Sequence, residues 1–547
     1  MKNYTYIALC CLAIGFSSCD VNNDLEAIQD TAPVVELDVR DLNFSSYVSL
    51  GASFTAGFTD GALFVASQEN SFPNILASKF RLANGGDFTQ PLMADNIGGF
   101  VLNGAAAQPP RLFFNGAGPA RLNALPTTNL LARAEGNTFN NLGVPGLKSF
   151  HIVAPGYGNI QGVATGAANP YFARMASSPN ATILEDALAQ NPTFFSLSEI
   201  GGNDVLSFAT SGGIGVDQRD NPDPRTYGSN DITSPIVFDA SVDAMVGALT
   251  ANGNTRGVIA TVPDIQLLPF FTTVPHNPLD PSNASFRSQI ALLNQVYGAV
   301  NQVFVAVGQT DRVITFSREI ANPVVIKDES LVDLSATISG ALGASPDFAT
   351  FVQGFGLPAE AVPLVASLFG NFYGQARAAT ENDLLVLPSS AVIGTVNTSN
   401  FEFLVSQNFP PQLAGQFSAE GVTLPLADQW VLTPEEQASI KVATDAFNEK
   451  INTVANTNAN LALVDLNQIL IEASSGIVFD NFTLNTNLVT GGLISLDGIH
   501  LTARGYALMA NKILESIDFK FGSNFTTATG GLAKAADFQT NYSPLLR

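Results

Sequence analysis

The stretch that decides the fold is YVSLGASFTAG, residues Tyr47–Gly57. A β-prone run ends at Gly51, and Ser53 follows two residues later among small residues. This order predicts a strand, a tight turn and the start of a helix, with the Ser53 hydroxyl at the carboxyl edge of a sheet. Open α/β sheets collect their active sites at that edge. Because glycine and serine also mark ordinary turns, Ser53 is at this point only a candidate nucleophile.

Short apolar runs alternate with helical patterns along the rest of the chain. The predicted buried strands are Phe194–Ile200, Gly257–Val262 and Asn460–Asp465. The predicted helices are Ser67–Leu82, Ala240–Leu249, Ser288–Val307 and Pro434–Ala455. Strands separated by helices favour an α/β fold, with a mostly parallel sheet covered on both faces.

The size and charge of the chain narrow the classes of function. Its 547 residues, 46% of them hydrophobic, can bury the core of one large domain or two ordinary ones. With 24 basic and 47 acidic residues, the formal net charge is -23. Such a surface repels phosphate backbones, so we do not expect nucleic acid as a partner. We interpret the acidity as a contribution to solubility.

The pattern at the amino terminus predicts a targeting signal. All three cysteines lie in the first 19 residues, and the apolar run Tyr6–Phe16 is too short to span a bilayer. Ser17-Ser18-Cys19 resembles a bacterial lipoprotein processing site, although Phe16 stands where such sites usually carry Leu. This resemblance implies a signal peptide at residues 1–18 and an acylated Cys19. An ordinary secretory signal is the alternative.

If Cys19 is acylated, the mature chain has no other thiol, and therefore no disulfide and no cysteine-based metal site. Residues 19–44 are polar and acidic and suit a tether between lipid and fold. We expect a protein anchored to the bacterial cell envelope, at the outer membrane, and not embedded in the bilayer.

The folded body is predicted at residues 45–520 and carries a long insertion at about 321–430. This insertion is apolar, with short helical pieces and a further predicted strand at Leu384–Leu387. It is either a lid or acyl-binding wall at the active-site edge, or a packing subdomain without a role in substrate choice. Leu82–Asn137 and the tail at 521–547 are rich in small and polar residues and are predicted to run over the surface.

One histidine has a carboxylate in reach. Asp497 precedes His500 by three residues, close enough in a loop to hold one imidazole nitrogen. That contact fixes the tautomer and leaves the other nitrogen free to take a proton from a serine. A purely structural histidine at the start of a helix is the alternative. His151 and His276 lack such a partner and are interpreted as structural or surface residues.

A helix is predicted directly after this pair, and two other segments of the chain could supply further polar groups to the same site. Thr502 is the predicted cap of the helix that follows, and the residues expected on the buried side of this helix are Tyr506, Met509, Ile513 and Leu514. At Gly201–Asp204 a strand ends in two glycines, so Asn203 can hold its amide over the sheet edge, where it suits a developing oxyanion. Read alone, this segment is also a good turn. The loop Asn140–Gly146 could present bare backbone N–H groups.

In this order the four segments resemble the SGNH hydrolases, the GDSL family of esterases and lipases. The matching blocks are Gly51–Phe54, Asn141–Gly146, Gly201–Asp204 and Asp497–His500, with Val258–Asp264 similar to a family strand and its loop. The resemblance spans roughly residues 46–518 and leaves the insertion uncovered.

The resemblance implies a three-layer α/β/α flavodoxin-like sandwich with a Ser-His-Asp triad. Ser53 would be the nucleophile, His500 the general base and then acid, and Asp497 the residue that orients His500. The oxyanion would be held by the backbone N–H groups of Ser53 and Gly146 and by the Asn203 side chain. The reaction would be acyl transfer through an acyl-enzyme, and it needs no metal or organic cofactor.

Two details stay open at this point. Gly146 is preferred to Gly143 because the family's glycine comes five residues after the loop asparagine, here Asn141. The family usually has Asp before the nucleophile and Leu after it, whereas this chain has Ala52 and Phe54. The missing Asp commonly helps to organise the nucleophile loop.

The leading hypothesis is therefore a lipid-anchored serine esterase or lipase. The alternatives are a polysaccharide O-deacetylase of the same fold, or a non-catalytic envelope lipoprotein that kept the fold as a binding module.

Overall fold

The computed structural model describes residues 34–547. The chain divides after Glu36, and the fold described here is Leu37–Arg547. The predicted signal peptide, Cys19 and the tether up to residue 33 lie outside the described residues. Leu42 and Phe44 are already buried, so the fold begins slightly before the predicted residue 45.

A five-stranded parallel sheet forms the centre of the fold. Its strand order is β13-β8-β7-β1-β6, and all four neighbouring pairs are parallel. The strands are β1 (Tyr47–Gly51), β6 (Asn141–Gly143), β7 (Phe194–Ser198), β8 (Arg256–Ala260) and β13 (Leu461–Val464). The predicted α/β class and the three predicted strands are confirmed, with ends that differ by one or two residues.

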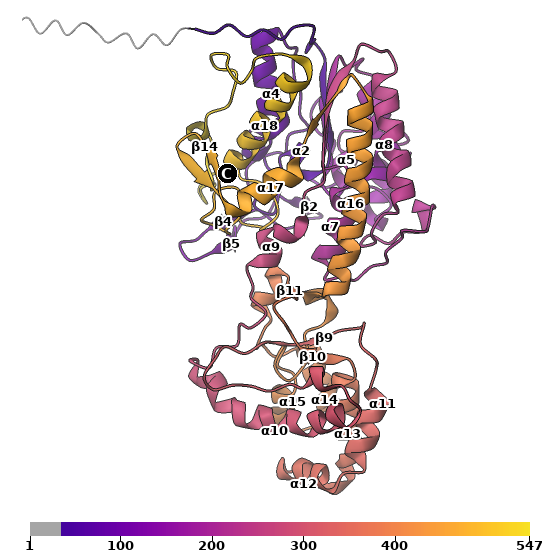
Figure 1. Cartoon of the computed structure of the whole chain (residues 1–547), viewed down its shortest axis with the longest axis vertical. Coiled ribbons are helices and arrows are strands. Elements are labelled where there is room, and N and C mark those ends of the chain that lie inside the picture. Colours follow the sequence, from indigo (N-terminus) through magenta and orange to yellow (C-terminus); the bar gives the residue numbers. More distant parts are fainter. Residues whose placement is uncertain (1–33) are drawn as a thin grey trace, which may run out of the picture. The chain divides into compact units, whose positions relative to one another are not determined.

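Helices pack on both sides of this sheet. Figure 1 shows α4 (Phe72–Phe80) and α18 (Ala503–Phe521) on one side and α8 (Pro235–Thr250) and α16 (Pro434–Thr457) on the other. The predicted helix Ser67–Leu82 is in fact two, because the chain turns at Asn70 and Ser71 between α3 (Val65–Glu69) and α4.

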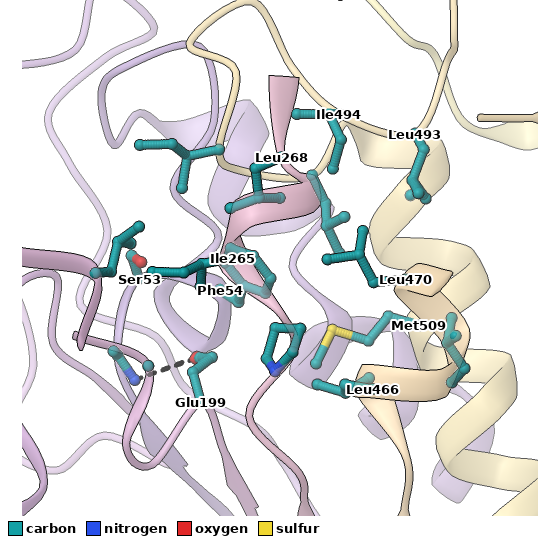
Figure 2. Close-up of a pocket in the computed structure, with 18 of the residues that line it drawn as sticks. Ser53, Phe54, Glu199, Ile265, Leu268, Leu466, Leu470, Leu493, Ile494 and Met509 are labelled. Carbon is teal, nitrogen blue, oxygen red and sulfur yellow. Dashed lines mark hydrogen bonds between the residues drawn. The ribbon is translucent and has the colours of Figure 1, made fainter. Parts of the chain in front are cut away.

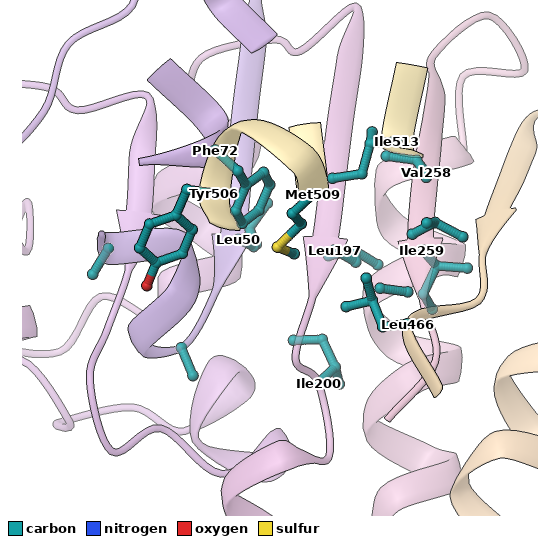
Figure 3. Packing of buried hydrophobic residues seen from close by; sticks show 14 of the residues in the cluster. Leu50, Phe72, Leu197, Ile200, Val258, Ile259, Leu466, Tyr506, Met509 and Ile513 are labelled. Atoms are coloured by element: carbon teal, nitrogen blue, oxygen red, sulfur yellow. The ribbon is translucent and has the colours of Figure 1, made fainter. Parts of the chain in front are cut away.

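The buried faces of these elements form one apolar core. In Figure 3, Phe72 of α4 and Met509 and Ile513 of α18 pack over strand residues such as Leu197 and Val258. Thr502 caps α18 by accepting a hydrogen bond from the Gly505 N–H. The four side chains predicted on the buried side of this helix are all buried, because they recur at the spacing of one helical face.

Residues 274–431 build a second apolar core of their own. Its helices and strands are α10 (Ala284–Ala306), β9 (Val325–Lys327), α11 (Ser335–Gly343), α12 (Pro346–Gly354), α13 (Val362–Tyr373), β10 (Ala376–Ala378), β11 (Leu384–Leu385), α14 (Thr398–Ser406), α15 (Pro411–Gln416) and β12 (Val431–Leu432). The helix predicted at Ser288–Val307 is present as α10, but its apolar face packs in the second core and does not cover the central sheet. Its periodicity indicates an amphipathic helix but not which surface receives the apolar face.

The remaining elements outside the second core are short. They are α2 (Ser53–Ala56), β2 (Phe100–Leu102), β3 (Ala105–Gln108), β4 (Leu112–Phe114), β5 (Pro119–Arg121), α5 (Pro170–Ala173), α6 (Ile183–Leu188), α7 (Gly202–Thr210), α9 (Pro269–Thr272), α17 (Leu466–Ser475), β14 (Ile477–Phe479) and β15 (Phe482–Leu484). The tail at 521–547 is packed more closely than predicted. Phe525 is fully buried, and the centroid of its ring lies 5.9 Å from that of Phe44 and 6.0 Å from that of Phe80.

Within residues 34–547, no single helix is long and apolar enough to cross a membrane. α12 and the segment Ala359–Tyr373 reach that length and composition only together, with a bend of 117° between them.

Candidate active site

Ser53 lies where the sequence predicted, directly after β1 and at the first position of α2. The turn needs glycine at Gly51, because a Cβ there would lie 2.4 Å from the Ser198 carbonyl oxygen. The Ser53 side chain is 9% exposed. Its hydroxyl forms no hydrogen bond with any other residue of the described chain, so it is free to contact a substrate.

The turn that carries Ser53 is held from both sides. Asn141 on β6 donates from its side-chain amide to the Thr55 carbonyl oxygen at 2.8 Å. On the other side, the Glu199 carboxylate accepts hydrogen bonds from the backbone N–H of Ala52 and of Thr55. Burial raises the pKa of Glu199 to about 8, although the hydrogen bonds from Thr55 and Ala52 favour its ionised form.

Sequence reasoning gave Glu199 no role. The signal was present, because a glutamate at the end of an apolar strand must find partners for a charge that the fold buries. The partners themselves lie more than 140 residues away and cannot be read from the local pattern.

His500 and Asp497 form the predicted pair. His500 Nδ1 lies 2.9 Å from Asp497 Oδ2, and Asp497 Oδ1 accepts from the backbone N–H groups of Ile499 and His500. Gly61 donates its N–H to Asp497 Oδ2 at 2.8 Å. Burial alone would raise the pKa of Asp497. The charge of His500 and these hydrogen bonds outweigh burial and hold that pKa well below its usual range.

The loop of this pair is held in place by α9. Phe270 donates its N–H to the Gly498 carbonyl oxygen at 3.0 Å. Gly498 has a φ of +79°, and a Cβ there would lie 2.9 Å from the Phe270 nitrogen, so glycine is required. His151 and His276 line neither of the two cavities described below.

The three predicted oxyanion donors all keep a free hydrogen. Asn203 uses one amide hydrogen on the Leu147 carbonyl oxygen, at 2.9 Å, and has a second one left. The N–H groups of Ser53 and Gly146 have no hydrogen-bond partner within residues 34–547. Gly143, in contrast, donates to the Asn141 side chain and approaches α2 too closely for a Cβ. This difference supports Gly146 over Gly143.

An apolar cavity of about 90 Å³ opens beside Ser53. Its polar lining groups are Ser53, Glu199 and Asn203, and the rest of its wall is mostly aliphatic. Figure 2 shows Ser53 and Glu199 on one side and aliphatic residues of α17 and α18, such as Leu470 and Met509, on the other. The wall comes from the sheet body, α17 and α18, and the predicted insertion at 321–430 contributes none of it.

His500 and Asp497 line a second, wider cleft of about 450 Å³. Ile499 lines both cavities, so the two adjoin. The ring centroids of Phe54 and His500 lie 5.7 Å apart. No hydrogen bond joins the Ser53 hydroxyl to His500 in the part of the chain that the structure describes. The structure therefore brings the predicted triad to adjoining cavities but not into direct Ser–His contact.

A second buried carboxylate, Asp60, lies beside this pair and accepts a hydrogen bond from the Leu496 N–H at 3.1 Å. Burial raises the pKa of Asp60 to about 7, and the charge of Asp497 adds to the increase. Because the folded-state pKa is above the unfolded value, the stabilising contribution of Asp60 is complete below about pH 4. It is lost as the pH rises through about 7.

We therefore expect Asp60→Asn to raise the free energy of unfolding by about 2–3 kcal/mol more at pH 8.5 than at pH 5. The asparagine keeps an acceptor for the Leu496 N–H but cannot ionise. Urea unfolding of both proteins at the two pH values measures this difference. An equal effect at both pH values would contradict the assignment of the buried charge to Asp60.

One group of three carboxylates within the described chain could hold a metal ion, and it is formed by Glu329, Asp428 and Glu436. None of the three lines the Ser53 cavity or the His500 cleft. Burial raises the pKa of Asp428 and of Glu436 to about 7, and neighbouring carboxylates contribute to both increases.

Comparison with known proteins adds no assignment, since no family model, curated protein or solved structure matches this chain.

Proposed function

We propose that this chain is a serine ester hydrolase of the SGNH type, with a flavodoxin-like α/β/α body. The main support is the position of Ser53 and Asn203 at the polar end of an apolar cavity that adjoins the His500–Asp497 pair. As predicted from the sequence, Cys19 would carry a lipid that anchors the protein to the cell envelope.

In the proposed reaction, the Ser53 hydroxyl attacks the ester carbonyl carbon and its proton passes to His500 Nε2. The carbonyl oxygen gains the negative charge and is held by the free N–H groups of Ser53 and Gly146 and by the Asn203 amide. The tetrahedral intermediate collapses, and the alcohol leaves with the proton from His500. Water activated by His500 then cleaves the acyl-enzyme and releases the acid. Ser53 and His500 must approach each other when substrate binds, because catalytic hydrogen bonds often shorten only in the substrate complex.

The apolar cavity favours an acyl-chain ester over an acetylated polysaccharide. Its aliphatic wall suits a hydrocarbon chain, whereas an acetyl group would leave most of this surface unused. The insertion would contact the part of the substrate that lies in the His500 cleft, because Leu387, Pro388 and Ser390 line this cleft. A preference for acetyl over longer acyl esters would instead favour the O-deacetylase alternative.

The test is labelling of the mature protein by a fluorophosphonate probe. We expect rapid labelling of the parent and a loss of at least about 10³-fold in the labelling rate in Ser53→Ala, because the probe reacts only with an activated serine. Ser241→Ala is the matched control, since Ser241 is a buried serine of α8 whose hydroxyl donates to the Val237 carbonyl oxygen.

A folded parent that does not label would refute the enzyme proposal and leave the binding-module alternative. Its support is Ala52, which replaces the usual Asp before the nucleophile.

A further inference from the structure

Glu199 is a buried carboxylate without a cationic partner. It is 8% exposed, and no Lys, Arg or His lies within salt-bridge distance of it in residues 34–547. Its backbone φ of +48° lies in the left-handed region that residues other than glycine rarely adopt. A costly backbone conformation combined with a buried carboxyl group indicates that this side chain has a specific role.

The partners of the carboxylate all belong to the turn that carries the proposed nucleophile. Glu199 Oε1 accepts from the Thr55 N–H at 2.9 Å, from the Thr55 hydroxyl at 2.9 Å and from the Ala52 N–H at 3.2 Å. Oε2 lies 3.2–3.3 Å from the same donors. The carboxylate thus binds the residues on both sides of Ser53 and leaves the Ser53 N–H without a partner.

Glu199 also connects this turn to Asn203, whose side chain is the proposed oxyanion donor. It stands between the end of β7 at Ser198 and the start of α7 at Gly202, and Asn203 is the second residue of that helix. Displacement of Glu199 would therefore shift the nucleophile and one oxyanion donor relative to each other.

We propose that Glu199 is a positioning residue. It holds the turn that carries Ser53 against the start of α7, which carries Asn203, so that the distance and angle between the nucleophile and the oxyanion donors are maintained. This inference rests on the proposed function of Ser53. Glu199 does not donate or accept a proton in the reaction. It acts through Ala52 and Thr55, and its loss should slow the chemical step more than it weakens substrate binding.

The experiment compares steady-state hydrolysis of a short-chain p-nitrophenyl ester by the parent, Glu199→Gln and Thr55→Val, using the full mature chain. The glutamine has one acceptor oxygen, so its amide group must face N–H donors, and the valine removes the hydroxyl donor alone. We expect kcat to fall about 10- to 100-fold in Glu199→Gln and about 3- to 10-fold in Thr55→Val, with KM within about 3-fold of the parent. The double variant should lose less than the product of the two effects, because both changes break one network.

Glu420→Gln is the matched control. Glu420 is a buried glutamate of the second core that accepts from the Asn397 amide, and its replacement should leave kcat and KM unchanged. Thermal unfolding of each variant shows whether it is folded. If Glu199→Gln does not fold, the kcat of Thr55→Val tests the proposal.

A folded Glu199→Gln or Thr55→Val that keeps the parent kcat would overturn the inference. A parent that neither hydrolyses esters nor labels at Ser53 would instead refute the proposed function. The two failures are therefore distinguishable.

Discussion

Replacement of Asp497 by asparagine is expected to lower kcat for ester hydrolysis by about 10³- to 10⁴-fold while KM changes little. Asp497 Oδ2 lies 2.9 Å from His500 Nδ1, and Oδ1 accepts two backbone N–H groups. Asparagine can keep the two backbone bonds with its oxygen, and its amide group then donates to Nδ1. His500 would carry its proton on Nε2 and could not accept one from Ser53.

The measurement is kcat and KM for a p-nitrophenyl ester over a range of pH. Asp518→Asn serves as the control, because Asp518 accepts hydrogen bonds from several neighbours near the carboxyl terminus but lines neither cavity. An Asp497→Asn variant with at least a tenth of the parent kcat would show that the carboxylate is not needed to orient His500.

Replacement of Arg111 by methionine is expected to lower the free energy of unfolding by about 3 kcal/mol. Arg111 is fully buried and donates to the carbonyl oxygens of Asn96 at 2.8 Å, Ser543 at 2.7 Å and Leu546 at 3.2 Å. Its guanidinium group also lies 5.1 Å from the centroid of the Phe64 ring. Methionine fills part of the space but leaves these carbonyl groups without a donor.

The shift in the urea midpoint measures this loss, and limited proteolysis should show earlier cleavage of the carboxyl-terminal tail that Arg111 holds. Arg133→Met is the control, because Arg133 is exposed and, within residues 34–547, its side chain donates to a single carbonyl oxygen, that of Ala176 at 2.7 Å. Equal midpoint shifts in the two variants would show that the buried contacts of Arg111 do not stabilise the tail.

Short-range spacing explains what could be predicted about the site. The strand, turn and helix around Ser53 follow from Gly51 and the small residues after it, and the His500–Asp497 contact spans only three residues. Thr502 and the periodic residues after it specify α18 for the same reason. Such features depend on neighbours in the chain, so a single sequence is enough to find them.

Contacts between distant segments could not be predicted in this way. The sequence showed that Ala52 precedes Ser53, but not that Glu199, 147 residues away, accepts a hydrogen bond from the Ala52 N–H. The sequence left open whether the insertion forms an acyl-binding wall or only a packing subdomain, and in the structure the cavity beside Ser53 is lined by α17 and α18 and by no residue of 321–430.

The sequence by itself therefore determined the α/β class, four of the five strands of the central sheet, the long helices α8, α10, α16 and α18, and the pairing of His500 with Asp497. Periodicity and local spacing suffice for these features because they arise within one element or one loop. Only the tertiary structure decided that α10 packs in a second core, that Arg111 holds the carboxyl-terminal tail and that Glu199 binds the Ser53 turn. An apolar face or a buried charge requires a partner, but it does not specify which distant segment supplies that partner.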